Sequence, residues 1–290
     1  MLLKLLLGVF FALLITGAAV RMRALSPSGF WAALALGTII FGLGGLAWAI
    51  ALLTFFVSSS LLSRLWGKQK RSLEEKFSKG HQRDAWQVLA NGGLAGGMAL
   101  LHAFIPHSPL PWVGFIAALA AANADTWATE LGALSPVSPR LITTLRPVER
   151  GTSGGISLLG TLAALSGAVL LALVGVLFWN GFILPIPAGV PFVLVDLLGG
   201  VPMLPPPGGA GLWFMIFSLS GLAGSLVDSL LGATVQAIYR CPACEKETER
   251  HPLHTCGTRT HLLRGWRWMN NDAVNFLCTF SAFVLSILFL

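Results

Sequence analysis

Charged residues are scarce in this sequence. Asp, Glu, Lys and Arg make up 11% of its 290 residues, whereas an average soluble domain carries about 25%. Hydrophobic residues make up 55%, and the mean hydropathy is +0.76. This composition excludes an ordinary water-soluble domain, because too few charged side chains are available to cover its surface. The sequence predicts an integral membrane protein in contact with the lipid bilayer.

Several common signatures are absent as well. No GxxxxGK[ST] motif occurs, which excludes a P-loop nucleotide site. No Pro/Ser-rich linker or low-complexity tract divides the chain, so we expect a single transmembrane domain over residues 1–290. Four cysteines are present, and three of them lie in one loop that we place in the cytoplasm, where disulfides are uncommon.

Eight apolar stretches approach the roughly 20 residues that a helix needs to cross a bilayer. They are residues 2–20, 30–43, 45–63, 87–105, 112–134, 156–179, 211–238 and 271–290. Arg21 and Arg23 follow the first stretch instead of preceding it, which favours an uncleaved helix over a signal peptide. The predicted fold class is therefore all-α, a polytopic transmembrane bundle of about eight spans.

The basic residues predict the orientation of this bundle. Their numbers per segment are one at position 4, two at 21–23, seven at 64–83, three at 140–150, six at 240–267, and none at 106–111 or 180–210. With eight helices, connections that contain Lys or Arg alternate with connections that contain neither. The positive-inside tendency places the basic connections in the cytoplasm. The net charge of +7 then reflects membrane orientation, and we expect no nucleic-acid partner.

The segment 180–210 is apolar but is interrupted repeatedly by proline and glycine. Because proline removes a backbone donor and clashes with the preceding turn, a regular membrane-spanning helix is not expected there. We interpret this segment as an external loop or a re-entrant piece.

Three carboxylates, those of Asp125, Glu130 and Asp228, interrupt predicted apolar helices. An ionisable group at membrane depth is costly unless it is paired or bound to a cation, so each is a candidate functional residue. From a helix end near residue 134, Asp125 and Glu130 lie at depths of roughly 14 and 6 Å. Other polar residues reach the same layer or lie beside these carboxylates: Asn91, Asn123, Thr126, Ser229, Asn271, Asp272 and Asn275.

Oxygen ligands without a nearby histidine suit Mg²⁺, which prefers carboxylates together with phosphate oxygens. Asp125 and Asp228 are the predicted magnesium ligands. The alternative is that these polar groups only join helices through hydrogen bonds. The presence of three carboxylates and several amides at one depth favours a functional site.

The segment RPVERGTSGG, residues 146–155, precedes the sixth predicted helix. Its glycines would let the backbone approach a ligand closely, and a helix N-terminus attracts anions. Arg146 and Arg150 add charges suited to phosphate. Helix capping alone would also explain its small residues. Beside the acidic layer, the segment predicts a phosphate-binding loop, formed by Gly151, Thr152, Ser153, Gly154 and Gly155.

The loop 239–270 contains a possible zinc site. Its CxxC pair, Cys241 and Cys244, is followed by His254 and Cys256, which completes a set of three cysteines and one histidine, a combination found in structural zinc sites. The spacing is irregular, so reduced cysteines without metal remain the alternative. In either case we expect a structural role for this loop, and no catalysis by cysteine.

Four motifs together resemble one known family: ANADTWATELG, RPVERGTSGG, GSLVDSLLGATVQ and NNDAVNF. The chain is similar, over about residues 21–285, to the integral membrane family once called domain of unknown function 92. That family includes transmembrane protein 19 of animals and the phytyl-phosphate kinase of tocopherol synthesis. The resemblance implies phosphate transfer from a nucleoside triphosphate, with CTP expected, to a prenyl monophosphate. It also implies a site lined by Asp125, Glu130, Arg150, Thr152, Ser153, Asp228, Asn271 and Asn275.

Two other functions would use similar residues. A membrane cytidylyltransferase would release pyrophosphate and leave CMP on the lipid, so its products would distinguish it. A cation-coupled transporter would place its carboxylates near the membrane midplane, with access from both sides. The polar residues here are displaced toward one side and the outer halves of the helices are almost wholly apolar, which argues against transport.

Overall fold

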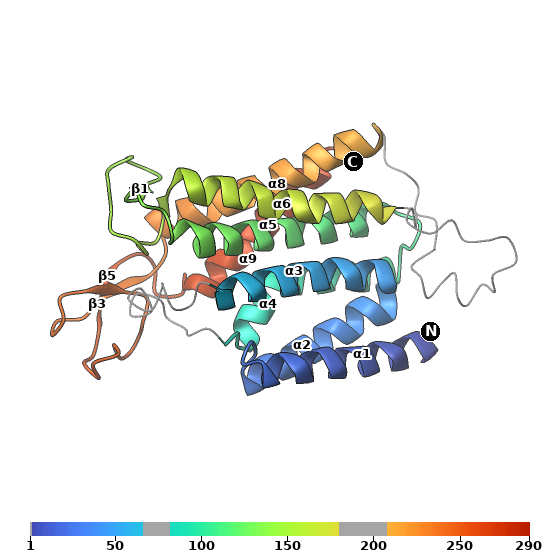
Figure 1. Cartoon of the computed structure of the whole chain (residues 1–290), viewed down its shortest axis with the longest axis horizontal. Coiled ribbons are helices and arrows are strands. Elements are labelled where there is room, and N and C mark those ends of the chain that lie inside the picture. The colour runs from blue at the N-terminus through green and yellow to red at the C-terminus, as the bar shows by residue number, and fades with distance from the viewer. Residues whose placement is uncertain (1, 66–81, 180–207) are drawn as a thin grey trace, which may run out of the picture.

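The computed structural model describes residues 2–65, 82–179 and 208–290, and these form a bundle of helices with two small sheets at one end (Figure 1). The α-helices are α1 (Leu2–Arg21), α2 (Pro27–Ile39), α3 (Leu46–Leu65), α4 (Ala85–His102), α5 (Leu110–Gly132), α6 (Leu158–Leu177), α8 (Gly209–Thr234) and α9 (Asn271–Ile287). A helix therefore forms in each of the eight predicted stretches. The predicted external segment 180–210 lies almost entirely outside the described residues.

Five helical segments of the described chain are long and apolar enough to cross a membrane. These are Leu2–Arg21, Pro27–Gly44, Leu46–Leu65, Leu158–Leu177 and Gly209–Thr234. The prediction of about eight spans exceeds this number, because α4, α5 and α9 are not among the five. Helix α9 has 17 residues, and α4 carries glycines and polar residues along much of its length. The chain is thus an all-α integral membrane protein with at least these five apolar segments.

Helix α5 lies at the centre of the bundle, where it contacts α3, α4, α6, α8 and α9. Every residue from Pro111 to Ala124 is buried, and many are alanines. A helix that is enclosed by other helices does not need large lipid-facing side chains, which explains why α5 is less apolar than its neighbours α6 and α8. Close helix approach depends on small residues: a Cβ on Gly221 of α8 would lie 2.9 Å from the Cβ of Ala120.

The predicted break between the second and third stretches is confirmed. Helix α2 continues into a π-helical turn, η1 (Ile40–Gly44), and Gly45 then adopts a φ of 84°, which favours glycine. Helix α3 begins immediately afterward at Leu46.

The sheets were not predicted from the sequence. Strands β3 (Ile238–Arg240), β4 (Glu247–Thr248) and β5 (His261–Arg264) form an antiparallel sheet in the order β4-β3-β5, and β1 (Arg140–Leu141) pairs with β2 (Gly155–Ile156). The predicted helix 211–238 accordingly ends early, at Thr234. Its apolar pattern continues past the helix end because Ala237, Ile238 and Tyr239 are buried in the following strand segment.

Candidate functional site

A polar cavity of about 340 Å³ opens at the sheet-bearing end of the bundle, which is within the usual volume range of ligand pockets. Helices α4, α5, α6, α8 and α9 all contribute to its wall. Among the predicted site residues, those that line it are Asn91, Asp125, Thr126, Glu130, Arg150, Gly151, Thr152, Ser153, Gly154, Gly155, Asp228, Ser229, Asn271 and Asn275. The structure therefore brings most of the predicted site into one place.

Asp125 and Asp228 meet where α5 packs against α8. Ser225, one turn before Asp228 on α8, forms a hydrogen bond with the Asp125 carboxylate. Asp228 lies close enough to Asp125 and Glu249 to be repelled by both carboxylates. Its Oδ2 atom is buried and has no hydrogen-bond partner among the described residues. Converging carboxylates with an unsatisfied buried oxygen fit a divalent cation that accepts oxygen ligands.

Glu130 lies five residues after Asp125 on α5, about one and a half turns further along and near the helix end. The hydroxyl of Ser63 on α3 donates a 2.8 Å hydrogen bond to Glu130 Oε1. This bond holds the carboxylate at the cavity wall, which Thr129 and the loop from Arg150 to Ser157 also line. Glu130 is thus positioned by a helix that sequence reasoning did not assign to the site.

Glu249 is a site residue that sequence reasoning missed. It belongs to the cysteine-containing loop, yet it lines the cavity. The hydroxyl of Ser153 donates to Glu249 Oε1 over 2.9 Å, and Gln236 Nε2 donates to the same oxygen over 2.8 Å. In the sequence, Glu249 is one acidic residue among several in a polar loop, so no signal distinguished it. Arg83, Gln87, Ser63, Ser225 and Gln236 also line the cavity and were not predicted.

The glycine-rich segment lines the cavity but does not cap helix α6 as expected. Ser157 is the cap, because its hydroxyl accepts a hydrogen bond from the Gly160 amide over 3.1 Å. Between the glycines and the helix, the chain forms strand β2 against β1. Gly151 and Gly154 have φ values of 78° and 84°, so the loop turns back in a conformation that favours glycine before the strand begins.

Three predicted residues do not line the cavity. Asn123 is fully buried and joins helices: Ser58 and Ser59 donate to its Oδ1 over 3.0 and 3.1 Å, and its Nδ2 donates to the Gly167 carbonyl over 2.9 Å. For Asn123, the alternative given above is therefore correct: its side chain joins helices through hydrogen bonds and does not line the site. Arg146 is exposed on its loop, and Asp272 lies in the first turn of α9 outside the lining set.

The four predicted zinc ligands form a compact cluster. The ligand atoms of Cys241, Cys244, His254 and Cys256 all lie within 4.8 Å of one another. Cys256 Sγ is 3.5 Å from Cys241 Sγ and 3.3 Å from His254 Nδ1. Hydrogen bonds with Thr258 and His254 lower the pKa of the Cys256 thiol to about 5. A thiolate beside a histidine and two further thiols is a ligand set suited to zinc.

This cluster is connected to the cavity through the small sheet. Cys241 follows β3 directly, and Glu249 follows β4. From β5, Arg264 donates to the Gly232 carbonyl at the end of α8 over 2.9 Å and to the Ser153 carbonyl over 3.4 Å. The loop 239–270 therefore holds both Glu249 and the glycine-rich segment in position.

The fold and the cavity define a class: an all-α integral membrane protein with a carboxylate-lined polar cavity at one end of its bundle. The family model described as "Integral membrane protein DUF92" matches residues 10–283. The chain belongs to this family, in agreement with the motifs quoted above.

Curated relatives include proteins from a plant, an archaeon and a cyanobacterium. The chain is 31% identical to Protein PGR of Arabidopsis thaliana over 287 residues, covering 94% of this chain and 92% of that protein. It is 34% identical to an uncharacterized membrane protein of Methanocaldococcus jannaschii, covering 73% of this chain and 75% of the relative. It is 25% identical to Protein VTE6, chloroplastic, of Arabidopsis thaliana, covering 90% and 64%. No solved structure matches.

Proposed function

We propose that this protein is a prenyl-phosphate kinase, which transfers a phosphate from CTP or another nucleoside triphosphate to a membrane prenyl monophosphate such as phytyl phosphate. The observation that carries the proposal is the buried oxygen of Asp228, which has no hydrogen-bond partner in the described part of the chain and lies beside Asp125, in a cavity shared with a glycine-rich loop that contains Arg150. Phosphoryl transfer requires mainly positioning and charge stabilisation, and these groups can supply both. The family resemblance supports the same reaction.

The carboxylates have a metal-binding role in this proposal. Asp125 and Asp228 would hold Mg²⁺, whose contribution is to neutralise charge on the phosphate oxygens. Ser225 on α8 forms a hydrogen bond with the Asp125 carboxylate, and Ser153 and Gln236 both donate to the carboxylate of Glu249. Glu130 faces the cavity from further along α5 and is the third carboxylate assigned a catalytic role.

The remaining polar groups would bind the phosphates. Arg150 lies at the cavity, and its guanidinium also donates to the Pro136 carbonyl over 3.1 Å, which restrains its position. The loop Gly151–Gly155 brings backbone and hydroxyl groups to the cavity wall. Asn91, Asn271 and Asn275 add amide donors from two further helices. A prenyl phosphate carries its own anionic nucleophile, so no strong general base is needed.

Transfer of label tests the reaction. Purified protein with Mg²⁺, phytyl phosphate and CTP labelled in its γ-phosphate should form a labelled prenyl diphosphate. Omission of Mg²⁺ should abolish the product. Absence of labelled lipid with every nucleoside triphosphate and every prenyl phosphate tested would reject the proposal.

The membrane topology is part of the proposal: eight spans, with the cavity facing the cytoplasm. Cysteines introduced at Val137 and Leu145, which are 68% and 59% exposed, should react with an impermeant maleimide only from the cytoplasmic side. Labels introduced within 64–86 should behave identically, and those within 180–210 should react only from outside. Labelling of 64–86 and 135–153 from opposite sides would contradict the helix count.

A structural zinc ion is also proposed, in the cluster of Cys241, Cys244, His254 and Cys256. Purified protein should contain about one zinc per chain, and Cys244→Ser should lower this content strongly, because one of the four ligands is lost. Cys278→Ala is the control, since this buried cysteine lies on α9, outside the cluster. Protein prepared without chelators and found free of zinc would leave only reduced thiols at this position.

A further inference from the structure

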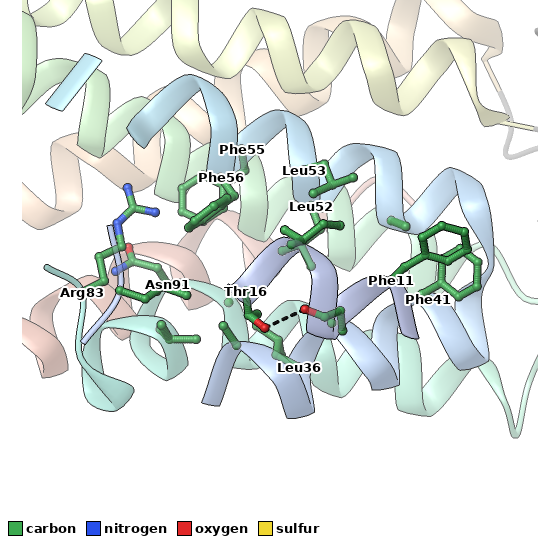
Figure 2. A pocket seen from close by; sticks show the side chains of 18 of the residues that line it. Phe11, Thr16, Leu36, Phe41, Leu52, Leu53, Phe55, Phe56, Arg83 and Asn91 are labelled. Carbon is green, nitrogen blue, oxygen red and sulfur yellow. Dashed lines mark hydrogen bonds between the residues drawn. The ribbon is translucent and has the colours of Figure 1, made fainter. Parts of the chain in front are cut away.

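A second cavity, of about 100 Å³, lies among helices α1 to α4 (Figure 2). Its walls are almost wholly apolar, with Phe11, Leu36, Phe41, Leu52 and Phe55 among the lining side chains. In Figure 2, Arg83 and Asn91 lie at one end, and Phe11 and Phe41 lie at the other, with their ring centroids 5.5 Å apart. We call this the apolar groove.

The apolar groove borders the polar cavity. Arg83, Gln87 and Asn91 line both of them, so the two spaces meet at the beginning of α4. Helix α2 and the following turn η1 line the groove from Ala33 to Phe41, a length of roughly 12 Å along the helix axis. An apolar space of this length therefore leads away from the junction, between helices that include three of the apolar membrane-spanning segments.

Arg83 is the charged group at this junction. Its guanidinium carbon lies 5.4 Å from the ring centre of Phe55 and 5.7 Å from that of Phe56. It forms no ion pair with a carboxylate among the described residues. Burial lowers the pKa of Arg83 to about 10, so the group remains cationic at neutral pH. Arg83 is half-buried and has no countercharge among the described residues, and its position beside two cavities suits an anionic ligand.

The backbone holds Arg83 firmly in this position. Its amide donates to the Ala24 carbonyl over 3.0 Å, and its carbonyl accepts from the Ser26 amide over 3.0 Å. The chain passes so close to Gly29 that a side chain there would overlap the Arg83 carbonyl. These contacts tie the α1–α2 connection to the start of α4 and fix the cation at the junction.

We propose that the apolar groove holds the prenyl chain of the monophosphate acceptor, and that Arg83 binds its phosphate at the junction with the polar cavity. This inference rests on the proposed function and adds the location and orientation of the lipid substrate. The phosphate then faces the carboxylates and the glycine-rich loop, while the chain extends between Leu52 on α3 and Leu36 on α2. A guanidinium can bind two phosphate oxygens at once, which fixes the orientation of the acceptor.

Chain-length dependence of the kinetics tests the groove. Ala49→Phe should fill its interior and lower kcat/KM for phytyl phosphate at least about 10-fold, while kcat/KM for the five-carbon dimethylallyl phosphate changes less than about 3-fold. The control is Val57→Phe, also on α3, where the side chain is 56% exposed on the outer face of the helix. If Ala49→Phe lowered kcat/KM equally for both substrates and kept wild-type thermal stability, the assignment of the prenyl chain to the groove would be wrong.

A binding measurement separates the groove from the reaction. A long-chain alkyl phosphate with a terminal diazirine should label peptides that contain Phe11 or Phe41, and Arg83→Gln should lower this labelling at least about 10-fold. Arg21→Gln, at the same end of the bundle, should leave it unchanged. Groove labelling without kinase activity would support the groove and reject the proposed reaction. Kinase activity with labelling elsewhere, or equal labelling by the corresponding uncharged alcohol, would reject the groove assignment.

Discussion

Asp125→Asn and Asp228→Asn should each lower prenyl-phosphate kinase activity at least about 100-fold, as is found when charge stabilisation at a phosphate is lost. Asparagine keeps the size of the side chain and much of its hydrogen bonding, but it removes the negative charge that a divalent ion requires. Stability should be unchanged or slightly higher, because one of two carboxylates that repel each other becomes neutral. The measurement is turnover at saturating CTP, Mg²⁺ and phytyl phosphate, together with the thermal midpoint.

Asp196→Asn is the control for this pair. Because the segment 180–210 is predicted to be external, the Asp196→Asn variant should retain wild-type turnover; this position lies outside the described residues. Near-normal activity of Asp125→Asn and Asp228→Asn, combined with a loss in Asp196→Asn, would place the site at the wrong end of the protein.

Gly154→Ala should also reduce turnover strongly, by about 100-fold, because misplacement of positioning groups by even 1 Å can have that effect. Gly154 has a φ of 84°, and an added Cβ would lie 2.5 Å from both the amide nitrogen and the Cβ of Ala233. The backbone of α8 cannot move away without displacing Asp228 and Ser229, so the glycine-rich loop must shift instead. The left-handed conformation adds a cost of about 1 kcal/mol or more to folding.

Gly211→Ala is the matched control, on the helix that Gly154 contacts. Gly211 belongs to α8, and an added Cβ there meets no atom within 4 Å. Its variant should keep wild-type turnover and thermal stability. If Gly154→Ala behaved like Gly211→Ala in both measurements, the loop would not depend on close contact with α8, and its assigned role at the site would be wrong.

The helices were predictable because long apolar runs and loop charges are local properties of a sequence. Helix α5 marks the limit of that reasoning. Its alanine-rich first half is suited to a position among other helices, and only the three-dimensional structure shows that Pro111–Ala124 are fully enclosed. Similarly, the small sheet around Tyr239 follows an apolar helix without a change in hydropathy, so the predicted helix extended four residues too far, to 238 in place of Thr234.

The site was predictable where a residue type was unusual for its surroundings. Asp125 and Asp228 attracted attention because carboxylates are costly inside apolar helices, and the cavity brings them together. Glu249 and Arg83 lie in polar connections that are rich in similar charges, so their types carried no signal. Their importance comes from tertiary contacts: Glu249 is separated by 96 positions from the Ser153 hydroxyl that holds it. Asn123 shows the converse, since a polar residue at membrane depth can act purely as a helix connector.

The central claim is that the terminal phosphate, and not the nucleotide, is transferred to the lipid. Purified protein should be incubated with Mg²⁺, phytyl phosphate and CTP labelled either in the α-phosphate or in the γ-phosphate. We predict that only the γ-label enters the lipid fraction, as a prenyl diphosphate, and that CDP is the nucleotide product. Entry of the α-label into the lipid, with release of pyrophosphate, would identify a cytidylyltransferase and contradict the account.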